Sequence, residues 1–469
     1  MRFGSRRSVT RHTTPDEDAT IKLHSHAVAP LDLKQVLNVL ADEPRRRLIH
    51  LLQELEVAPS HSKETAPVTV RDATQLLSDG IIATIPRSDI LGWTTPFSVR
   101  EDKADGPRRR FILWPKHQNE EVYERGFTSS TTMQHVSSYL HPVSKPFGLT
   151  RDLKVGFWQV ALSDTAARCF CFSDASGQTY KMLRLPMGHS CSVDIQEIIT
   201  GAIAGSIAYC RPDSALPGPV PDIWVDGARW AGTKEELSKV AADVDQRAKS
   251  LSATWKEFDQ PSSVYDFIGV NFNHDASTVR VADKTRAKIP DECPPKISPR
   301  ALEQLVGRLL FAAGIAGIPL ARHYFAIKWC RRIFNRANWS SSWLEPVSVP
   351  RSARTLLTSW CKDCVLERKW FEPHGRGEAY LFTDATPSGW GAVVMTSSNK
   401  VFATGGHIHD TFDSINSTET LAVRFGVEAF FNILSSVDKL HIVVDNTSAP
   451  ISCRARLALL SWQGLSLRQ

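Results

Sequence analysis

Short apolar runs separated by longer helical patterns fill the middle of the sequence, and this alternation is what most constrains the fold. Runs typical of strands occur at "VGFWQVAL" (155–162), "DIWVD" (222–226) and "YDFIGVNF" (265–272). The stretches "CSVDIQEIITGAIAGSIAYC" (191–210) and "KEELSKVAADVDQRAKSLSATW" (234–255) have the length and apolar spacing of helices. Strands mixed irregularly with helices predict an α+β layer rather than a regular strand–helix–strand repeat.

Further elements are expected on either side of this region. The stretch "DGPRRRFILWPKHQN" (105–119) predicts a hairpin, because Asp105-Gly106-Pro107 supplies a turn before a strand-like run. After the proline-rich boundary at 290–300 the pattern is helical to about residue 365. A second hairpin is predicted over 379–406, followed by a helix over 417–434 and a strand that ends near Asp445.

The composition is that of an ordinary globular protein with a modest excess of positive charge. The net charge of the 469 residues is +6, which permits a polyanionic partner without requiring one. No run of about 18 apolar residues occurs, so no membrane-spanning helix is expected. The cysteines number nine, an odd and scattered set that argues for a reducing compartment. The one CxxC pair, Cys361 and Cys364, has no second pair at metal-finger spacing, so a helical cysteine pair is favoured over a zinc or redox site.

The first residues are basic, since Arg2, Arg6, Arg7 and Arg11 all precede the first acid, Asp16. This pattern fits an organelle transit peptide or a loose basic arm that touches nucleic acid, and an unstructured start is the simpler alternative. We expect an intracellular protein of the nucleus or cytoplasm, with the arginine-rich start leaving the mitochondrion open.

Two aspartates stand next to strand-like runs. Asp152 comes just before the apolar-aromatic run at 155–162, and Asp226 ends the run at 222–226. Two carboxylates on adjacent strands can share a pair of divalent ions that hold the attacking and departing oxygens of a phosphoryl transfer. Magnesium needs only one or two protein carboxylates besides the substrate phosphates. Aspartates are also common in turns, so spacing alone leaves the ordinary turn acid as the alternative.

Five blocks around these aspartates resemble, in order, those of a reverse transcriptase, the right-handed polymerase of retroelements. The resemblance covers roughly residues 70 to 330. The blocks are "TTPFSVREDKADGPRRRFILWPKHQN" (94–119) for the fingers hairpin, "LTRDLKVGFWQVAL" (149–162) for the first catalytic motif, "YKMLRLPMGHSCSVDIQ" (180–196) for the Leu-Pro-x-Gly block, "IWVDG" (223–227) for the Tyr-x-Asp-Asp motif, and "YDFIGVNF" (265–272) for the primer grip.

The resemblance implies that Asp152 and Asp226 hold two Mg²⁺ ions, with Mn²⁺ as an alternative. Phe157 lies five residues after Asp152, where the family places an aromatic wall that excludes a ribose 2′-hydroxyl. A core phenylalanine would look the same in the sequence.

The resemblance also implies residues that bind substrate. Lys103 and Arg110 lie in the expected fingers hairpin and would bind the phosphates of the incoming nucleotide, with surface solvation as the alternative. Gly188 would let the backbone approach a ligand, although a plain turn uses the same residue. Gln196 would contact the template or nucleotide, or stand as a polar residue of a helix.

Gly227 departs from the family pattern, because the motif normally ends in two adjacent aspartates. The first acid faces the metals and the second is peripheral, so the glycine removes one negative charge from the site. This fits a divergent branch of the family, and it equally fits a domesticated or decaying copy.

The C-terminal stretch resembles the ribonuclease H that is fused to retroelement polymerases. The matching segments are "LFTDATPSGWGAVV" (381–394), "NSTETLAV" (416–423) and "HIVVDN" (441–446). Asp384, Glu419 and Asp445 fall where that family places three of its four metal-binding carboxylates. The fourth acid and a histidine would follow beyond Gln469, so the domain is expected to be incomplete and its hydrolysis more doubtful than polymerisation.

The sequence therefore predicts an α+β protein: a right-hand polymerase with fingers, palm and thumb, followed by a partial ribonuclease H-like α/β domain. The expected segments are a basic arm with a short helical extension (1–67), fingers and palm (68–270), a mostly helical thumb and connection (271–370), and the ribonuclease H-like domain (371–469).

The expected function is that of an RNA-directed DNA polymerase of a retroelement, with an RNA template, a DNA primer or RNA–DNA hybrid, and deoxynucleoside triphosphates as partners. The stretches at 223–233 and 302–316 resemble the DIRS-like elements with a tyrosine recombinase, including trypanosomatid forms. The alternative is a domesticated, inactive relative that binds RNA or hybrid duplex as a structural component of an assembly.

Overall fold

The computed structural model falls into two compact units. It describes residues 21, 23–24, 27–103, 106–129, 131, 136, 139–256, 260–318, 320–340, 342–369, 378–396, 401–408, 415–434, 437 and 439–444. The first unit comprises residues 1–135 and 145–268, and the second comprises residues 136–144 and 269–469. The sequence predicts four segments, whereas the structure divides into two units.

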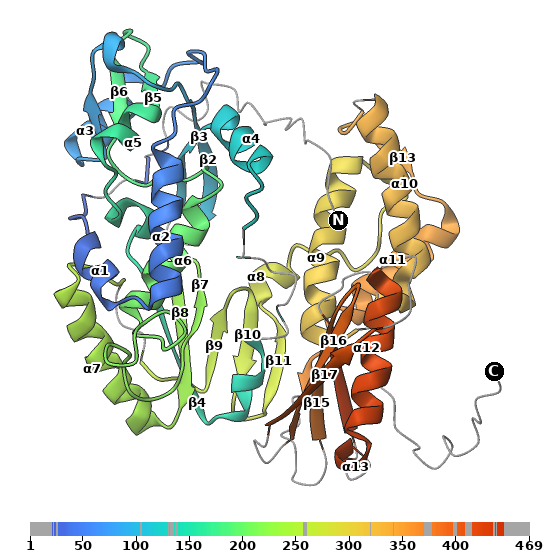
Figure 1. The fold of residues 1–469 in the computed structure, drawn as a ribbon. Coiled ribbons are helices and arrows are strands. Elements are labelled where there is room, and N and C mark those ends of the chain that lie inside the picture. The colour runs from blue at the N-terminus through green and yellow to red at the C-terminus, as the bar shows by residue number, and fades with distance from the viewer. Residues whose placement is uncertain are drawn as a thin grey trace. The chain divides into compact units, whose positions relative to one another are not determined.

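The first unit carries three small antiparallel sheets and the helices that cover them (Figure 1). Its helices are α1 (Leu33–Val39), α2 (Asp42–Leu55), α3 (Val70–Ser78), α4 (Lys116–Glu124), α5 (Asp164–Cys169), α6 (Ser192–Ile203) and α7 (Lys234–Ser250). Its strands are β1 (Ile82–Thr84), β2 (Thr95–Lys103), β3 (Gly106–Trp114), β4 (Phe147–Asp152), β5 (Cys171–Ser173), β6 (Thr179–Met182), β7 (Asp222–Trp224), β8 (Gly227–Gly232) and β9 (Val264–Phe267).

The hairpin predicted near residue 105 is present as β2 and β3. Its register runs from Thr95 opposite Trp114 to Lys103 opposite Gly106. Gly106 has a φ of 115°, a backbone conformation that glycine adopts without strain. The other two sheets have the strand orders β1-β6-β5 and β4-β8-β7.

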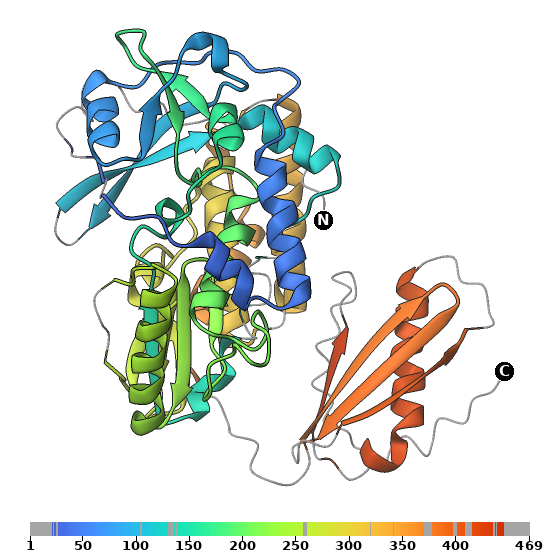
Figure 2. The same cartoon turned by 60° about the vertical axis from the view of Figure 1, so that its left-hand side comes forward.

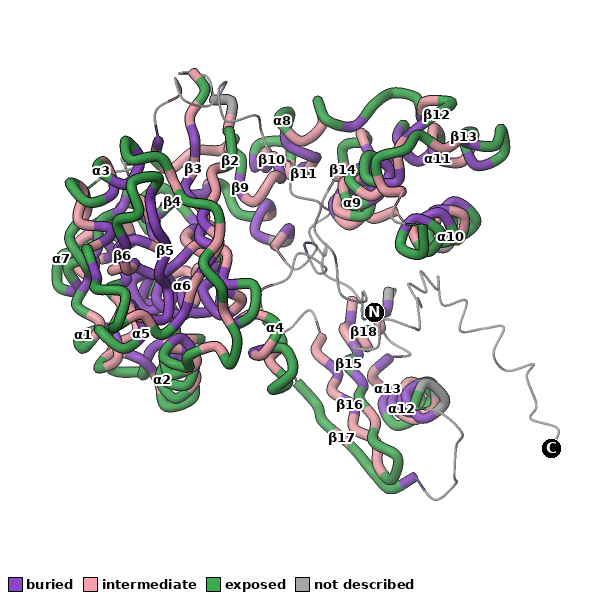
Figure 3. The backbone as a smooth tube through the Cα atoms, turned by 90° about the horizontal axis from the view of Figure 1, so that it is seen from above, coloured by how far each residue is buried: buried purple, intermediate pink, exposed green. Residues whose placement is uncertain are grey.

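Helices α6 and α7 form the support for the sheet β4-β8-β7. Ten of the twelve residues of α6 are buried, which Figure 3 shows as an almost continuous purple tube within the first unit. Helix α7 begins with a capping box, in which Thr233 and Glu236 satisfy each other's backbone N–H groups. Helix α7 packs against β4 and β8, and α6 packs against β7 and β8. Asp152 and Gly227 pair where β4 ends and β8 begins.

One strand prediction in this unit was wrong. Residues 155–162 form not a strand but the 3₁₀-helix η5 (Gly156–Gln159). Val155 has a left-handed φ of 45°, and the fully buried amide of Gln159 donates to the carbonyls of Lys154 and Thr254, both at 2.8 Å. Apolar residues bury in a 3₁₀ turn as well as in a strand, so the short run could not distinguish the two. The run at 265–272 is strand as predicted, but residues 268 and 269, both with positive φ, divide it into β9 and a second strand that begins at Val270.

The second unit begins with short strands and continues with helices, as predicted for residues 300 to 365. The strands are β10 (Val270–Asn273), β11 (Thr278–Val281), β12 (Lys296–Ile297), β13 (Val347–Ser348) and β14 (Arg368–Lys369). The helices are α8 (Asp283–Arg286), α9 (Pro299–Ala316), α10 (Tyr324–Ser340) and α11 (Arg351–Asp363). Helix α9 starts at Ser298, whose hydroxyl accepts from the N–H of Ala301, and it has proline at its first position.

The C-terminal part of the second unit is a four-stranded sheet with a helix across one face (Figure 2). The elements are β15 (Glu378–Thr386), β16 (Gly389–Thr396), β17 (Val401–His407), α12 (Ile415–Ala429), α13 (Phe431–Leu434) and β18 (Lys439–Val444). The strand order is β17-β16-β15-β18, and β18 runs parallel to β15. The predicted hairpin, helix and strand are present, and β17 extends the hairpin by a third antiparallel strand. Among the described residues of the whole chain, no helix has the length and apolar character needed to cross a membrane.

Candidate active site

A two-residue hairpin turn positions Asp226. Strand β7 ends at Trp224 and β8 begins at Gly227, and these two residues pair across the strands. Val225 and Asp226 form the turn, with Val225 in the left-handed region at φ 53°. Hairpins with two-residue loops need a positive φ at this position to match the twist of their strands. Asp226 therefore stands at the tip of the hairpin.

Strand pairing brings Asp152 beside Asp226. Asp152 ends β4 directly opposite Gly227, and the N–H of Leu153 donates to the carbonyl of Asp226 at 2.8 Å. A β-carbon at position 227 would lie 3.1 Å from Oδ1 of Asp152. The structure thus gathers the two aspartates, which are 74 positions apart in the sequence (226 − 152), at one edge of one sheet.

The backbone beside both aspartates is strained. Val155 and Val225 have φ values of 45° and 53°, and a β-branched residue in this region clashes with its own carbonyl. Strain of about 1–3 kcal/mol per residue persists only where the surrounding structure imposes it, and it clusters at functional sites. The fold therefore imposes these conformations on the two turns that follow Asp152 and precede Asp226.

The two aspartates of the site have different electrostatic surroundings. Burial raises the pKa of Asp226, and the charge of Asp152 raises it further, while Lys256 and Arg110 act in the opposite direction. Asp152 is exposed and forms an ion pair with Lys256, whose Nζ lies 2.8 Å from Oδ2. The ion pair with Lys256 shows that Asp152 is placed to bind a cation at the cavity.

Both aspartates open into a cavity of about 1210 Å³. Of the residues predicted to bind substrate, Arg110 and Phe157 line it, and Phe157 is half-buried in η5. The other ionisable residues of the lining were not among the predicted site residues; they are His24, Arg108, Lys154, Lys256 and Asp266.

The basic triplet of β3 divides between two faces of the hairpin. Arg108 and Arg110 point to the cavity side and share Glu101, at 3.0 and 2.9 Å. Arg109 points the other way and is buried against Asp72. This split follows from the two-residue period of a strand. Lys103 ends β2, and its side chain lies outside the described part of the structure.

Strand β3 occupies the space that a side chain at Gly188 would need. Its φ is 138°, and a β-carbon there would lie 2.4 Å from the carbonyl oxygen of Leu113. Its own carbonyl accepts from the side-chain amide of Asn119 at 2.8 Å. The Leu-Pro-x-Gly loop is thereby held against β3, and it is the preceding residue, Met187, that lines the cavity.

Gln196 lies beneath the cavity floor. Its side chain is fully buried, its Nε2 donates to Thr200 at 3.3 Å, and its Oε1 has no hydrogen-bond partner. A β-carbon on Gly156 would touch both Nε2 of Gln196 and Cβ of Asp226, at 3.2 and 2.9 Å. Gln196 is thus close to Asp226 but is not part of the cavity lining.

The candidate acids of the C-terminal sheet occupy two different places. Glu419 lies on α12, is 9% exposed, and has an unpaired Oε2. Leu381 and Thr383 of β15 face α12 through contacts at Gly426, so the strand period turns Asp384 to the other face. Asp445 lies outside the described residues.

One helix of the second unit combines basic and aromatic side chains. Helix α10 has no acidic residue, and Lys328 lies 5.7 Å from the ring of Tyr324. Phe325 and Trp339 are 72% and 91% exposed, which is unusual for large aromatic side chains. The other exposed cations of the helix are Arg331, Arg332 and Arg336. Such a surface fits phosphates and base faces.

The donor set at Asp152 and Asp226 fits a magnesium ion. Carboxylate oxygens are the ligands that this hard cation prefers, and one or two suffice where substrate phosphates complete the shell. Throughout the described ranges, no three His, Cys, Asp or Glu side chains lie close enough to hold a metal. Two protein carboxylates are therefore what this site offers.

Comparison with known proteins finds similarity in fold and none in sequence. No protein-family model matches the sequence, and no curated protein matches it either. The structure resembles that of a foamy viral protease-reverse transcriptase dRH in complex with double-stranded DNA, with a TM-score of 0.55 and 13% identity over 97% of this chain and 80% of that chain. In fold, the chain resembles a reverse transcriptase. A second such structure, of the foamy viral protease-reverse transcriptase with double-stranded DNA, gives a TM-score of 0.50 at 13% identity over 92% and 90% of the two chains.

Proposed function

We propose that the chain is an RNA-directed DNA polymerase of a retroelement, acting on a primer–template by two-metal nucleotidyl transfer. The observation that carries this proposal is the meeting of Asp152 and Asp226 at the floor of a cavity whose wall holds Arg108 and Arg110. Carboxylates that bind divalent ions opposite cations that bind phosphate are what in-line transfer to a nucleoside triphosphate needs.

Each residue has a role in this reaction. Asp152 and Asp226 would hold two Mg²⁺ ions, in the place where Lys256 now pairs with Asp152. The metals, when bound, lower the pKa of the primer 3′-hydroxyl and stabilise the charge on the triphosphate. Arg110 binds phosphate oxygens, since a guanidinium offers paired donors to them. Phe157 lies against the sugar and selects deoxynucleotides.

Nucleic acid is the proposed macromolecular partner. The two foamy viral structures are complexes with double-stranded DNA. In this chain, α10 has four exposed cations and three exposed aromatic rings. Phosphate contacts of this kind release counterions, so binding of an RNA–DNA hybrid is expected to weaken steeply with salt.

Primer extension tests the proposal. The full chain is given poly(rA) annealed to oligo(dT) with dTTP, in Mg²⁺ and then in Mn²⁺, beside an Asp152→Asn/Asp226→Asn double variant. Extension by the wild type and its loss in the variant, with hybrid binding retained, is the expected result. Retention of activity by the double variant would exclude this site as the polymerase centre.

Two finer parts of the proposal concern the element and its second domain. We assign the chain to the DIRS-like group with a tyrosine recombinase on the stretches at 223–233 and 302–316. An attached ribonuclease H would use Asp384, Glu419 and Asp445, as the resemblance implies, and this requires Asp384 to turn toward α12 from the opposite face of β15. Release of labelled fragments from the RNA strand of a hybrid, lost in Glu419→Gln, tests that activity separately from polymerisation.

A second candidate function rests on Gly227. With a glycine where a carboxylate completes the usual motif, the chain would serve as an inactive relative that binds RNA or hybrid duplex as a structural component of an assembly. Salt-sensitive hybrid binding without extension in either metal would favour this function.

A further inference from the structure

A fully buried arginine lies on the strand that follows Asp226. Arg229 belongs to β8, and its side chain has no exposed surface. It shares one face of the strand with Gly227, because side chains of a strand alternate between two faces. That face is also the face of Asp152, since a β-carbon at position 227 would lie 3.1 Å from Oδ1 of that aspartate. A charge buried this close to the site needs partners in the protein, because an uncompensated buried charge is strongly destabilising.

Asp222 pairs with Arg229 across the β7–β8 hairpin. The two residues stand opposite each other in the strand register. Nε and Nη2 of Arg229 both donate to Oδ2 of Asp222, at 3.1 and 2.5 Å. The pair therefore joins the two strands that lead into and out of the turn at Asp226.

The same guanidinium contacts β9. Its Cζ lies 5.1 Å from the centroid of the Phe267 ring, which is a cation–π distance. Phe267 is 6% exposed and lines the cavity, and its Cε2 would lie 3.6 Å from a β-carbon at position 227. One aromatic ring thus lies along the face of β8 from Arg229 to Gly227.

Tyr265 adds a second contact between Arg229 and β9. Burial raises the pKa of the Tyr265 hydroxyl to about 12, while the charge of Arg229 and a hydrogen bond between the two side chains act in the opposite direction. The ring of Tyr265 packs on β4, where a β-carbon at Gly148 would lie 2.2 Å from its Cε1. The backbone of Gly148 also pairs with that of Ser262, with both N–H···O distances at 2.9 Å. Strand β9 is thereby fixed to both β4 and β8.

We propose that Arg229 is a positioning residue that fixes the β7–β8 hairpin against β9, and with it the place of Asp226 beside Asp152. The inference rests on the proposed function and adds a residue that itself binds neither metal nor substrate. A guanidinium suits this place because it is planar, always charged and rich in donors, so it can bind a carboxylate and lie against a ring at once. Apolar side chains of similar size would fill the space without directional bonds between the strands.

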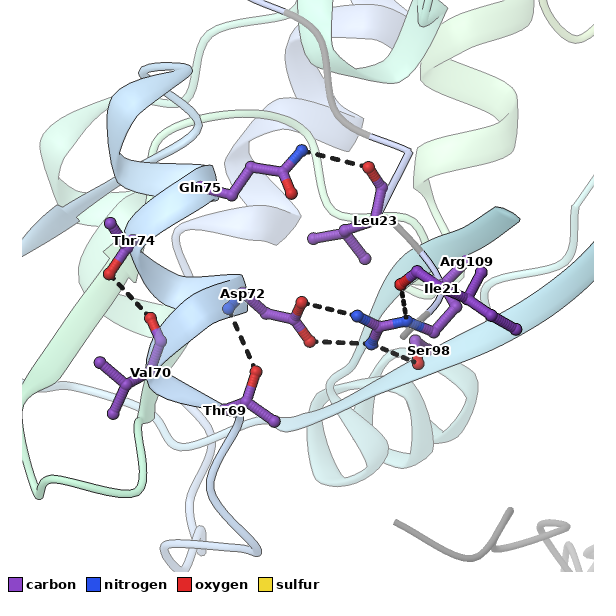
Figure 4. Close-up of polar contacts among 9 residues, drawn as sticks. All are labelled: Ile21, Leu23, Thr69, Val70, Asp72, Thr74, Gln75, Ser98 and Arg109. Atoms are coloured by element: carbon purple, nitrogen blue, oxygen red, sulfur yellow. Dashed lines mark hydrogen bonds and ion pairs between the residues drawn. The ribbon is translucent and has the colours of Figure 1, made fainter. Parts of the chain in front are cut away.

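A second buried pair of the same kind provides a matched control. The two terminal nitrogens of Arg109 on β3 donate to the carboxylate oxygens of Asp72 on α3, at 2.7 and 2.8 Å (Figure 4). Arg109 and Asp72 are 5% and 7% exposed, and neither is among the lining residues of the cavity. This pair resembles that of Arg229 and Asp222 but belongs to the other hairpin, β2–β3.

Manganese binding by the full chain without other metals tests the proposal. The test variant is Arg229→Met/Asp222→Leu, and the control is Arg109→Met/Asp72→Leu. Each variant removes one positive and one negative charge, so the net charge stays the same, and apolar replacement of a buried pair is expected to preserve the fold. We expect the Kd for Mn²⁺, measured by calorimetry, to rise about ten-fold in the test variant, as when other residues that orient metal ligands are lost. The control should stay within about two-fold of the wild type.

Two further measurements separate positioning from a loss of stability. Amide hydrogen exchange over residues 222–229 should be faster in the test variant than in the control, while the two variants should have similar urea midpoints of unfolding. Arg229→Lys keeps a charge beside Asp222 but loses the paired donors. Its Kd for Mn²⁺ should therefore lie between those of the wild type and the test variant.

An unchanged Kd for Mn²⁺ in the test variant would overturn the inference. An equal rise in the control would do the same, because it would indicate a general loosening of the first unit. A wild type that binds no Mn²⁺ would overturn both the inference and the proposed function. Weaker Mn²⁺ binding in the test variant, without primer extension by the wild type, would refute the polymerase and leave the positioning role of Arg229 standing.

Discussion

Gly227 faces Asp152 directly across a strand pair, and a β-carbon at position 227 would lie 3.1 Å from Oδ1 of that aspartate. A carboxylate carried there would therefore enter the same charged site as Asp152 and Asp226. The glycine leaves the site with two protein acids, and its neighbour Asp226 already has a raised pKa because of burial and the charge of Asp152.

A carboxylate at position 227 should tighten metal binding and should lower the stability of the metal-free protein. For Gly227→Asp we expect about a ten-fold lower Kd for Mn²⁺ and, in chelator, a free energy of unfolding about 1 kcal/mol lower than that of Gly227→Asn, because like charges repel in a half-buried site. Gly227→Asn carries the same β-carbon contact without the charge. Calorimetry and urea unfolding measure both quantities, and equal values in the two variants would show that the third charge does not reach the site.

The raised pKa of Asp226 predicts a pH dependence of stability. The folded pKa lies above the unfolded value of about 3.9, so the folded state binds the proton more tightly. The stabilisation is then fully present below about pH 4 and is lost as the pH rises through the raised value. Without metal, the free energy of unfolding of the wild type relative to Asp226→Asn should fall across this window.

The comparison with Asp226→Asn cancels the contributions of the other acids, such as Asp174, whose pKa is lowered by its hydrogen bonds in spite of its burial. Added Mg²⁺ should abolish the fall, since a bound cation favours the ionised carboxylate. A difference that stays constant from pH 4 to pH 8 would contradict the prediction.

Spacing and residue type predicted the parts of the site that lie on regular elements. The predicted hairpin β2–β3 carries Arg110, and the predicted run at 222–226 forms β7 with Asp226 directly after it. Asp152, in contrast, was expected to precede a strand and instead ends β4, which was not predicted. These features can be predicted because the apolar residues that a strand buries and the turn residues that end it are neighbours in the sequence.

Contacts between distant segments could not be predicted in this way. His24 lines the cavity, and the chain just before it is bound by Arg109, whose Nε donates to the carbonyl of Ile21 while its terminal nitrogens pair with Asp72, 37 positions away. Gly188 has the glycine of a ligand-binding loop, yet its space is taken by the backbone of Leu113. Both outcomes depend on tertiary packing, which leaves no mark on local periodicity.

Lys256 is expected to compete with the metal at Asp152. Both side chains of this ion pair are 54% exposed, so the pair contributes little to stability, about 0–1 kcal/mol. Lys256→Met should lower the Kd for Mn²⁺ by a few-fold and leave the unfolding temperature nearly unchanged. The matched control is Lys154→Met, which removes an exposed charge from the same cavity, and an equal gain there would indicate a general field effect rather than competition at Asp152.

At Val225, which precedes Asp226 and has a left-handed φ, we expect glycine to be more stabilising than alanine. This is the reverse of the usual order for the two residues. Val225→Gly and Val225→Ala lose nearly the same apolar surface, but only glycine adopts a φ of 53° without strain. We expect the glycine variant to be more stable than the alanine variant by about 1 kcal/mol in urea unfolding. At Val99, which is exposed in the interior of β2, the order should be the opposite, with alanine more stable by about 0.5–1 kcal/mol. Alanine as the better residue at both positions would mean that the hairpin relaxes, and that the strain beside Asp226 is not imposed by the fold.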